Sequence, residues 1–122
     1  MPNWLKKESV QERKVCVTYE AIYDIVETEE YIRNKFGDER AAKYRWQIKE
    51  EIKNLSITAS IYTRSGFKYR NYVIYKKPFS PAIIFWVIKD DGVVHVLRVP
   101  REEYDWKRYF ESNRYLEYSY PV

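Results

Sequence analysis

The chain has few of the residues that build metal, disulfide or covalent catalytic sites. Cys16 is the single cysteine and His95 the single histidine among 122 residues. One cysteine cannot form a disulfide within the chain, and this pair is too small for a Cys/His zinc site. A Gly-rich phosphate loop, a nucleophile elbow and a carboxylate–metal motif are also missing from the sequence. We therefore expect no metal and no cofactor.

Long apolar runs are missing too. None approaches the roughly 20 residues that span a bilayer. The opening segment MPNWLKKESVQERK is positively charged, but no apolar segment follows it as in a secretory signal. These absences predict a cytoplasmic protein with no membrane partner.

The residues that are present are typical of one globular domain. With 122 residues, 45% of them hydrophobic, the chain can bury a single core. We divide it into a polar N-terminal extension (1–13), one folded domain (14–110) and an aromatic C-terminal tail (111–122). The net charge of +4 and the pI near 9.0 favour an anionic partner, either a nucleic acid or an acidic protein. Packing explains the 13 tyrosines better than base stacking does.

Two amphipathic helices are predicted after a short strand at residues 15–17. Thr18 is placed as the N-cap of the first helix, and Gly37 ends it. The apolar stripe of that helix is expected to contain Ala21, Ile22, Ile25, Val26, Thr28, Ile32 and Phe36. Asp38 should cap the second helix, whose core face is expected to contain Ala41, Tyr44 or Arg45, Ile48, Ile52 and Leu55. Helices of about 18 residues need packing partners, so these two should form an antiparallel hairpin.

Strands are predicted to dominate the second half of the chain. Residues 56–66 are rich in serine and threonine and predict a loop. Strands are expected at 67–76, at 83–88 as a central strand, and at 93–99 beyond an Asp91-Gly92 hairpin.

Prolines and the C-terminal segment complete the predicted fold. Pro78 and Pro81 should bracket a turn, residues 101–110 suit a short helix, and 112–122 form a tail. The expected fold class is α+β: an N-terminal strand and a long antiparallel helical hairpin packed on a small, mainly antiparallel sheet.

Basic side chains on the predicted strands are candidates for binding a nucleic acid or another target. They are Arg64, Lys68, Arg70, Lys76, Lys77 and Arg98. Because Lys68 and Arg70 lie two apart in a predicted strand, they should project from one face, where two cations can hold a phosphodiester. The alternative is a solvated face that keeps an exposed strand from aggregating.

Candidate proton-transfer groups lie further along the chain. His95 is in the middle of an apolar strand, where a packed, hydrogen-bonded histidine is a better explanation than a general base. Glu102, Glu103, Tyr104 and Asp105 follow the last strand. A carboxylate or tyrosine there can accept or shuttle a proton, whereas the alternative is that the acids cap a helix.

The order of these segments resembles the RelE/ParE superfamily. The resemblance rests on the strand VCVTY, the helices EAIYDIVETEEYIRNKFG and DERAAKYRWQIKEEIKNL, and strands that end in DDGVVHVLRVPREEYDW. Its most telling motifs are A-x-x-D-I-x-x-x-x-x-Y-I at 21–32, V-L-R-V at 96–99 and D-W at 105–106. Together the matching segments cover residues 15–106.

This resemblance implies the toxin of a bacterial type II toxin–antitoxin module, also known as a plasmid stabilisation protein. Such a toxin inhibits growth until a small acidic antitoxin neutralises it. RelE-like members are mRNA interferases that cut messenger RNA on the ribosome without a metal, and ParE-like members have longer helices and poison DNA gyrase. On the RelE-like pattern, the catalytic candidates would be Lys68, Arg70, Arg101, Tyr104 and Glu102.

Two departures favour the ParE-like activity. Ala82, Ile83 and Ile84 stand where RelE-like toxins carry an arginine, and losing such a donor can cost about 10²–10³ in rate. The long helices point the same way. We therefore expect non-catalytic inhibition of a target such as DNA gyrase. A ribosome-dependent mRNA endonuclease is the alternative, and an inactive interaction protein that retains the fold is the second alternative.

Overall fold

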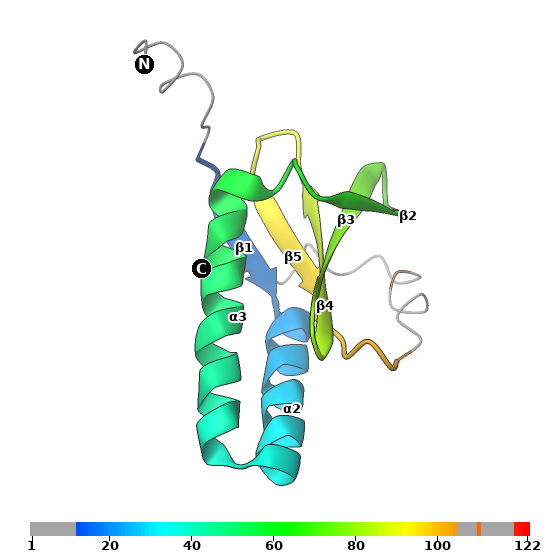
Figure 1. The fold of residues 1–122 in the computed structure, drawn as a ribbon. Coiled ribbons are helices and arrows are strands. Elements are labelled where there is room, and N and C mark those ends of the chain that lie inside the picture. The colour runs from blue at the N-terminus through cyan, green and yellow to red at the C-terminus, as the bar shows by residue number, and fades with distance from the viewer. Residues whose placement is uncertain (1–11, 105–109, 111–118) are drawn as a thin grey trace.

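A helical hairpin packed on a six-stranded sheet forms the molecule, in the computed structural model that describes residues 12–104, 110 and 119–122. Its elements are β1 (Val15–Thr18), α2 (Tyr19–Phe36), α3 (Asp38–Thr58), β2 (Thr63–Tyr69), β3 (Tyr72–Phe79), β4 (Ala82–Ile88), β5 (Val94–Arg98) and β6 (Ser119–Pro121). The sheet order is β2-β3-β4-β5-β1-β6, and the one parallel pair among these strands is β1 with β5 (Figure 1). The predicted α+β fold is confirmed.

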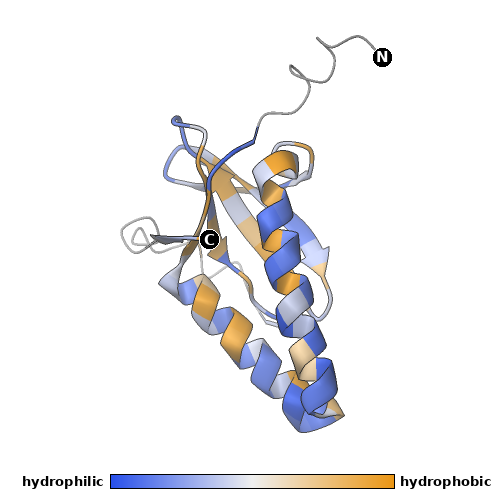
Figure 2. Ribbon diagram, turned by 90° about the vertical axis from the view of Figure 1, so that its left-hand side faces the viewer, coloured by the Kyte–Doolittle hydropathy of each residue, from blue (hydrophilic) through white to orange (hydrophobic). Residues whose placement is uncertain are grey.

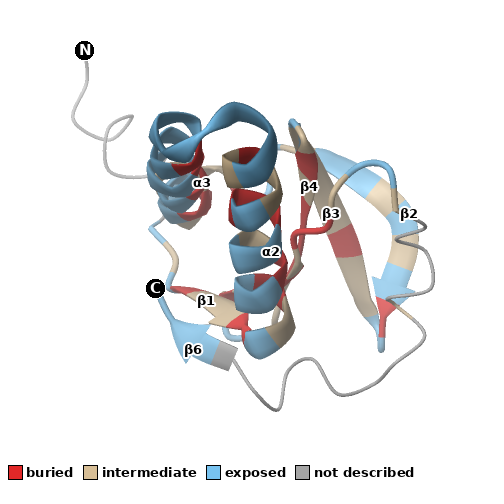
Figure 3. Cartoon of the chain, turned by 90° about the horizontal axis from the view of Figure 1, so that it is seen from below, coloured by how far each residue is buried: buried red, intermediate tan, exposed pale blue. Residues whose placement is uncertain are grey.

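The hairpin covers one face of the sheet and extends past its lower end (Figure 1). Both helices carry apolar and hydrophilic residues in turn, as amphipathic helices do (Figure 2). Their buried residues are turned toward the strands, and the outer sides are exposed (Figure 3). None of the helices in the described ranges is long and apolar enough to cross a membrane.

Local capping chemistry determines where α2 begins and ends. The Thr18 hydroxyl accepts the Ala21 N–H at 3.0 Å, so the predicted N-cap is confirmed. Gly37 ends the helix with φ of 96°, a conformation that favours glycine. The predicted capping role of Asp38 is wrong, since Gly37 is the N-cap of α3 and makes no side-chain cap hydrogen bond. The Asp38 carboxylate instead accepts from Arg33 Nε at 3.0 Å.

The predicted core face of α2 is only partly correct. Ala21, Thr28 and Ile32 are buried, but Ile22, Val26 and Phe36 are exposed. The buried face includes the charged residues Asp24 and Glu29 instead. The apolar stripe of α2 is wider than the surface that packs on the sheet, so part of it stays exposed. The cost of burying the two acids is offset by their ion pairs.

The predicted core face of α3 is confirmed, with Tyr44 rather than Arg45 inside. The buried residues are Ala41, Tyr44, Ile48, Ile52 and Leu55. The helix continues to Thr58 and β2 begins at Thr63, so the predicted loop at 56–66 is wrong over most of its length. Burial of Leu55 and Ala59 holds this turn in place despite its poor helix formers.

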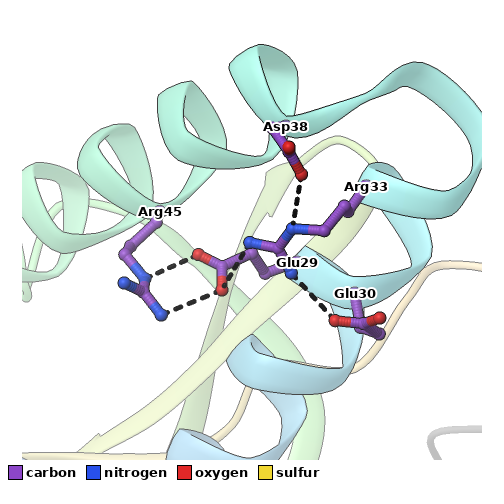
Figure 4. Close-up of polar contacts among 5 residues, drawn as sticks. All are labelled: Glu29, Glu30, Arg33, Asp38 and Arg45. Atoms are coloured by element: carbon purple, nitrogen blue, oxygen red, sulfur yellow. Dashed lines mark hydrogen bonds and ion pairs between the residues drawn. The ribbon is translucent and has the colours of Figure 1, made fainter.

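An ionic network joins the two helices toward the closed end of the hairpin (Figure 4). Glu29, which is 4% exposed, accepts from Arg45 Nε at 2.6 Å and Nη2 at 3.0 Å. Arg33 lies 3.6 Å from the same carboxylate and also pairs with Glu30 and Asp38. The two helices are thus connected by charge as well as by apolar packing.

The predicted strand at 67–76 is wrong, because it is two strands. A two-residue turn, Arg70-Asn71, separates β2 from β3, with Tyr69 paired to Tyr72. Arg70 adopts a φ of 56°, which lies outside the strand region. The turn contains no glycine or proline, and its two consecutive polar residues are what interrupts the alternation.

The other predicted strand signals are confirmed in outline. β4 is an interior strand, and the Asp91-Gly92 turn leads into β5 as its antiparallel partner. Ser80 and Pro81 form the β3–β4 turn, whereas Pro78 lies within β3 rather than at a turn boundary. β4 separates two apolar clusters: Ile84 and Trp86 face the hairpin, and Phe85 and Val87 face the outer side.

Residues Ser119–Pro121 of the predicted tail form the strand β6. β6 pairs antiparallel with β1, and the Val122 N–H donates to the Val15 carbonyl at 2.9 Å. Phe110 packs edge-on against Phe85 on the outer face. Half of the helix predicted at 101–110, including Asp105, lies outside the described residues, and Arg101 to Tyr104 form a bridge and a turn.

A buried ion pair fastens α2 to the end of β5. Asp24, 5% exposed, accepts from Arg98 Nε and Nη2 at 2.7 Å each, and from the Val99 N–H at 2.9 Å. Burial raises the pKa of the Asp24 carboxyl, and the Arg98 and Val99 hydrogen bonds oppose that rise.

We predict that Arg98→Met destabilises the protein by about 3 kcal/mol, because it leaves a buried carboxylate without its counter-charge. Adding Asp24→Asn should recover most of the loss, since the amide is neutral and its oxygen still accepts from Val99. Urea unfolding of both single variants and the double variant measures this. A loss below about 1 kcal/mol for Arg98→Met would show that the pair is dispensable.

His95 is half-buried on β5, beside Cys16 in the parallel pairing with β1. Its Nδ1 is buried and has no hydrogen-bond partner among the described residues, so the hydrogen bond expected for a packed histidine is not found at that atom. Burial lowers the pKa of His95 below 6.5, and Lys89 acts in the same direction while Asp91 opposes it.

We predict that stability falls as the pH drops below 6.5, the ordinary pKa of histidine. In that range the unfolded chain takes up a proton at His95 that the folded chain does not, so protonation favours unfolding. Urea midpoints measured on both sides of pH 6.5 test this, with His95→Gln as the comparison. An equal pH dependence in the variant would assign the effect to other groups.

Candidate functional site

The basic residues predicted to bind a target do not form one surface. Lys68 is exposed on β2, but Arg70 lies in the following turn with its guanidinium 5.2 Å from the Tyr69 ring centroid. The expectation that these two cations project from one strand face is therefore wrong. Arg64 on β2 is exposed, and Lys76 on β3 is half-buried.

Two of the predicted binding cations have partners inside the protein. Lys77 contacts Glu51 and donates to the Tyr62 hydroxyl at 2.9 Å. Burial lowers the pKa of Lys77. Arg98 forms the ion pair with Asp24 described above. Both side chains thus stabilise the packing between helices and sheet.

A polar cluster does form where β5 ends, and it contains two of the predicted catalytic residues. Arg101 donates to the Tyr104 hydroxyl, and that hydroxyl lies 3.3 Å from the Glu27 carboxylate on α2. The Arg101 guanidinium stacks between the Tyr31 ring at 4.1 Å and the Tyr104 ring at 4.6 Å. We call Glu27, Tyr31, Arg101 and Tyr104 the Arg101 cluster.

The β3–β4 turn completes this region. Ser80 donates to Glu102 at 3.0 Å, and the Glu102 N–H donates to the Pro81 carbonyl at 2.8 Å. Glu103 pairs with Arg101 at 2.9 Å. A cleft of about 490 Å³ is lined by Tyr31, Ser80, Pro81, Arg101, Glu102 and Glu103. Ala82, which stands where RelE-like toxins have an arginine, forms a bridge with Arg101 and is buried.

The Arg101 cluster is better suited to binding than to proton abstraction. Partial burial raises the pKa of the Tyr104 phenol, and the nearby Glu27 carboxylate raises it further. The hydroxyl therefore stays protonated near neutral pH and can donate a hydrogen bond. Glu103 already neutralises Arg101, which reduces the positive charge available to a phosphate. His95 lies within β5, before the strand ends, and is not among the residues that line this cleft.

No metal site is evident in the described ranges, where no three His, Cys, Asp or Glu side chains gather closely enough to hold an ion. The participation of Glu27 and Tyr31 was not predicted, because α2 reaches the cluster only through the tertiary fold. The motif Y-I at Tyr31-Ile32 was the one sequence signal pointing to that helix segment.

A second feature was also missed: a groove of about 620 Å³ between α2, α3 and the C-terminal strand. Its floor is apolar and its α3 wall is basic. The floor residues are Val17, Ile22, Ile25, Val26, Ile52 and Val122, and the wall residues are Arg45, Lys49 and Lys53. We call it the helix–tail groove. In the sequence, this groove was indicated by the apolar residues of α2 that outnumber those the sheet can cover.

Comparisons with known proteins identify the fold. No protein-family model matches the chain, and no curated protein sequence matches it. Among solved structures, a chain of the chromosomal ParDE toxin–antitoxin system from P. aeruginosa is similar, with a TM-score of 0.62 and 19% sequence identity. The match covers 76% of this chain and 99% of that one. The chain therefore has the RelE/ParE-like toxin fold.

Proposed function

We propose that the protein is the toxin of a type II toxin–antitoxin module, that a small acidic antitoxin neutralises it in the cytoplasm, and that it inhibits its target by binding. The observation that carries this proposal is the fold shared over most of the chain with a member of a ParDE system. The same fold without a partner or target would be the inactive interaction protein.

The helix–tail groove supports an acidic antitoxin as the partner. Ile22 and Val26 are 38% and 53% exposed in its floor, so a partner's apolar side chains could replace water there. Lys49 and Lys53 line the same groove, and their charge attracts acidic side chains at the rim. An acidic segment with one apolar face matches both properties.

Inhibition by binding, rather than by RNA cleavage, is supported by the state of several predicted site residues. Lys77 and Arg98, predicted to bind a target, and Arg101, a predicted catalytic residue, all contact carboxylates of this chain. Tyr104 remains a proton donor, because its pKa is raised. The helices, 18 and 21 residues long, agree with the ParE-like expectation. One observation favours the mRNA endonuclease instead: Arg101 and Tyr104 lie together, as metal-free cleavage requires.

We predict that Lys49→Glu with Lys53→Glu weakens antitoxin binding about tenfold or more, which is about 1.4 kcal/mol, by opposing an acidic partner. The antitoxin in this test is the product of the neighbouring small open reading frame, co-expressed and then measured by calorimetry. Arg40→Glu with Lys43→Glu changes the net charge equally at other α3 positions and should bind normally. Equal binding by both double variants would remove the groove from the antitoxin interface.

We predict that induction in cells produces gyrase-linked DNA breaks without codon-positioned cuts in messenger RNA. Mapping of RNA 5′ ends and of covalent gyrase–DNA complexes after induction distinguishes the two activities. If RNA cuts appear and disappear in Tyr104→Phe with Arg101→Ala, the endonuclease is correct and binding inhibition is wrong. If neither signal appears, the inactive interaction protein is the better description.

A further inference from the structure

A second groove lies on the other side of the hairpin, between its closed end and the β3–β4 turn. The hairpin extends past the end of the sheet, so the β3–β4 turn lies beside the helices rather than beyond them (Figure 1). A depression of about 500 Å³ lies between Phe36, Arg40 and Lys43 on the helices and Pro81 on the turn. It adjoins the 490 Å³ cleft of the Arg101 cluster, and both are lined by Tyr31. We call the combined feature the hairpin–turn groove.

Cations without an acidic partner line the α3 side of this groove. Arg40 and Lys43 are exposed, and neither forms an ion pair with any described residue. Lys35, on α2, lies over the Tyr31 ring at 5.2 Å. The acids at the opposite end already have partners, since Glu102 accepts from Ser80 and Glu103 pairs with Arg101. The α3 side is therefore the positive end of the groove.

The position of Arg40 does not favour the stability of α3. It is the third residue of the helix, which begins at Asp38. The helix macrodipole makes the first turn partly positive, so a cation there is unfavourable. The Arg40 guanidinium lies over the Phe36 ring, which does not neutralise its charge. An anion outside the chain would give Arg40 and the neighbouring Lys43 a counter-charge.

Aromatic rings lie beside these cations. Phe36 is 56% exposed at the end of α2, with the Arg40 guanidinium 5.1 Å from its ring centroid. Tyr31 is half-buried and holds the Arg101 guanidinium at 4.1 Å. Exposed rings next to cations can stack nucleobases while the cations contact phosphates. An acidic peptide would use the charges but would have no need of an exposed ring.

We infer that the hairpin–turn groove binds a single-stranded nucleic acid. Phosphates contact Arg40 and Lys43, and a base stacks on Phe36. The inference goes beyond the proposed function, because it assigns a second ligand to a surface on the other side of α3 from the helix–tail groove.

Fluorescence anisotropy of the purified wild-type protein with labelled oligo(U) and oligo(dT) over a range of salt tests the inference. Arg40→Glu with Lys43→Glu should lower affinity about tenfold or more at low salt, and it should flatten the log–log salt dependence by about 1.4, the value for two lost phosphate contacts. Phe36→Ala should lower affinity severalfold and leave the salt dependence unchanged, because stacking releases no counterions.

Lys49→Glu with Lys53→Glu is the matched control: it makes the same change in net charge in the other groove and should keep wild-type affinity for both oligonucleotides. Circular dichroism confirms that each variant is folded. Equal losses in both double variants would mean attraction by net charge alone and would overturn the inference. Binding of polyglutamate as tightly as oligo(U), with no effect of Phe36→Ala, would also overturn it and identify an acidic-peptide surface. Antitoxin binding is measured separately, so either proposal can fail while the other stands.

Discussion

The ion pair between Asp24 and Arg98 is the interaction on which the geometry of the candidate site depends. It joins residues 74 positions apart and orients α2 against the end of β5. The segment from Pro100 to Tyr104 follows closely after this ion pair. The Arg101 guanidinium therefore lies against the ring of Tyr31, which is also on α2. The two motifs behind the family resemblance in this region, A-x-x-D-I and V-L-R-V, meet in this contact. Their residues therefore hold the fold together.

Internal ion pairs of this kind also limit which cations can take part in chemistry. A cation that stabilises a buried carboxylate cannot also stabilise the charge that develops on a reacting phosphate without uncovering that carboxylate. Arg98 forms an ion pair with Asp24, and Lys77 contacts both Glu51 and Tyr62. Arg101 does lie beside a candidate acid–base group, Tyr104, but Glu103 shares its charge. The electrostatics of this region therefore favour recognition over phosphoryl transfer.

Features that depend on a few neighbouring residues could be predicted from the sequence. Thr18 caps its helix and Gly37 ends it through contacts within one turn, and the core face of α3 follows from its period. The Arg70-Asn71 turn was missed because it contains neither glycine nor proline and strand-forming residues flank it on both sides, although asparagine favours turns. Exposure of Ile22 and Val26 was missed because periodicity finds apolar residues but does not tell which of them the sheet covers.

For the site, the sequence placed Arg101 near Tyr104, which is a local relation, but it gave no sign of Glu27, since that contact requires the whole fold. The two grooves follow from the same physics. With about 100° between successive residues, the row of Arg45, Lys49 and Lys53 is turned roughly 160° from Arg40 and Lys43 on α3. A single helix buried on one side can thus present two separate basic surfaces. One of them is lined with aliphatic side chains and the other with aromatic rings, so they suit different ligands. A protein with this arrangement can hold a partner in one groove while the other remains accessible.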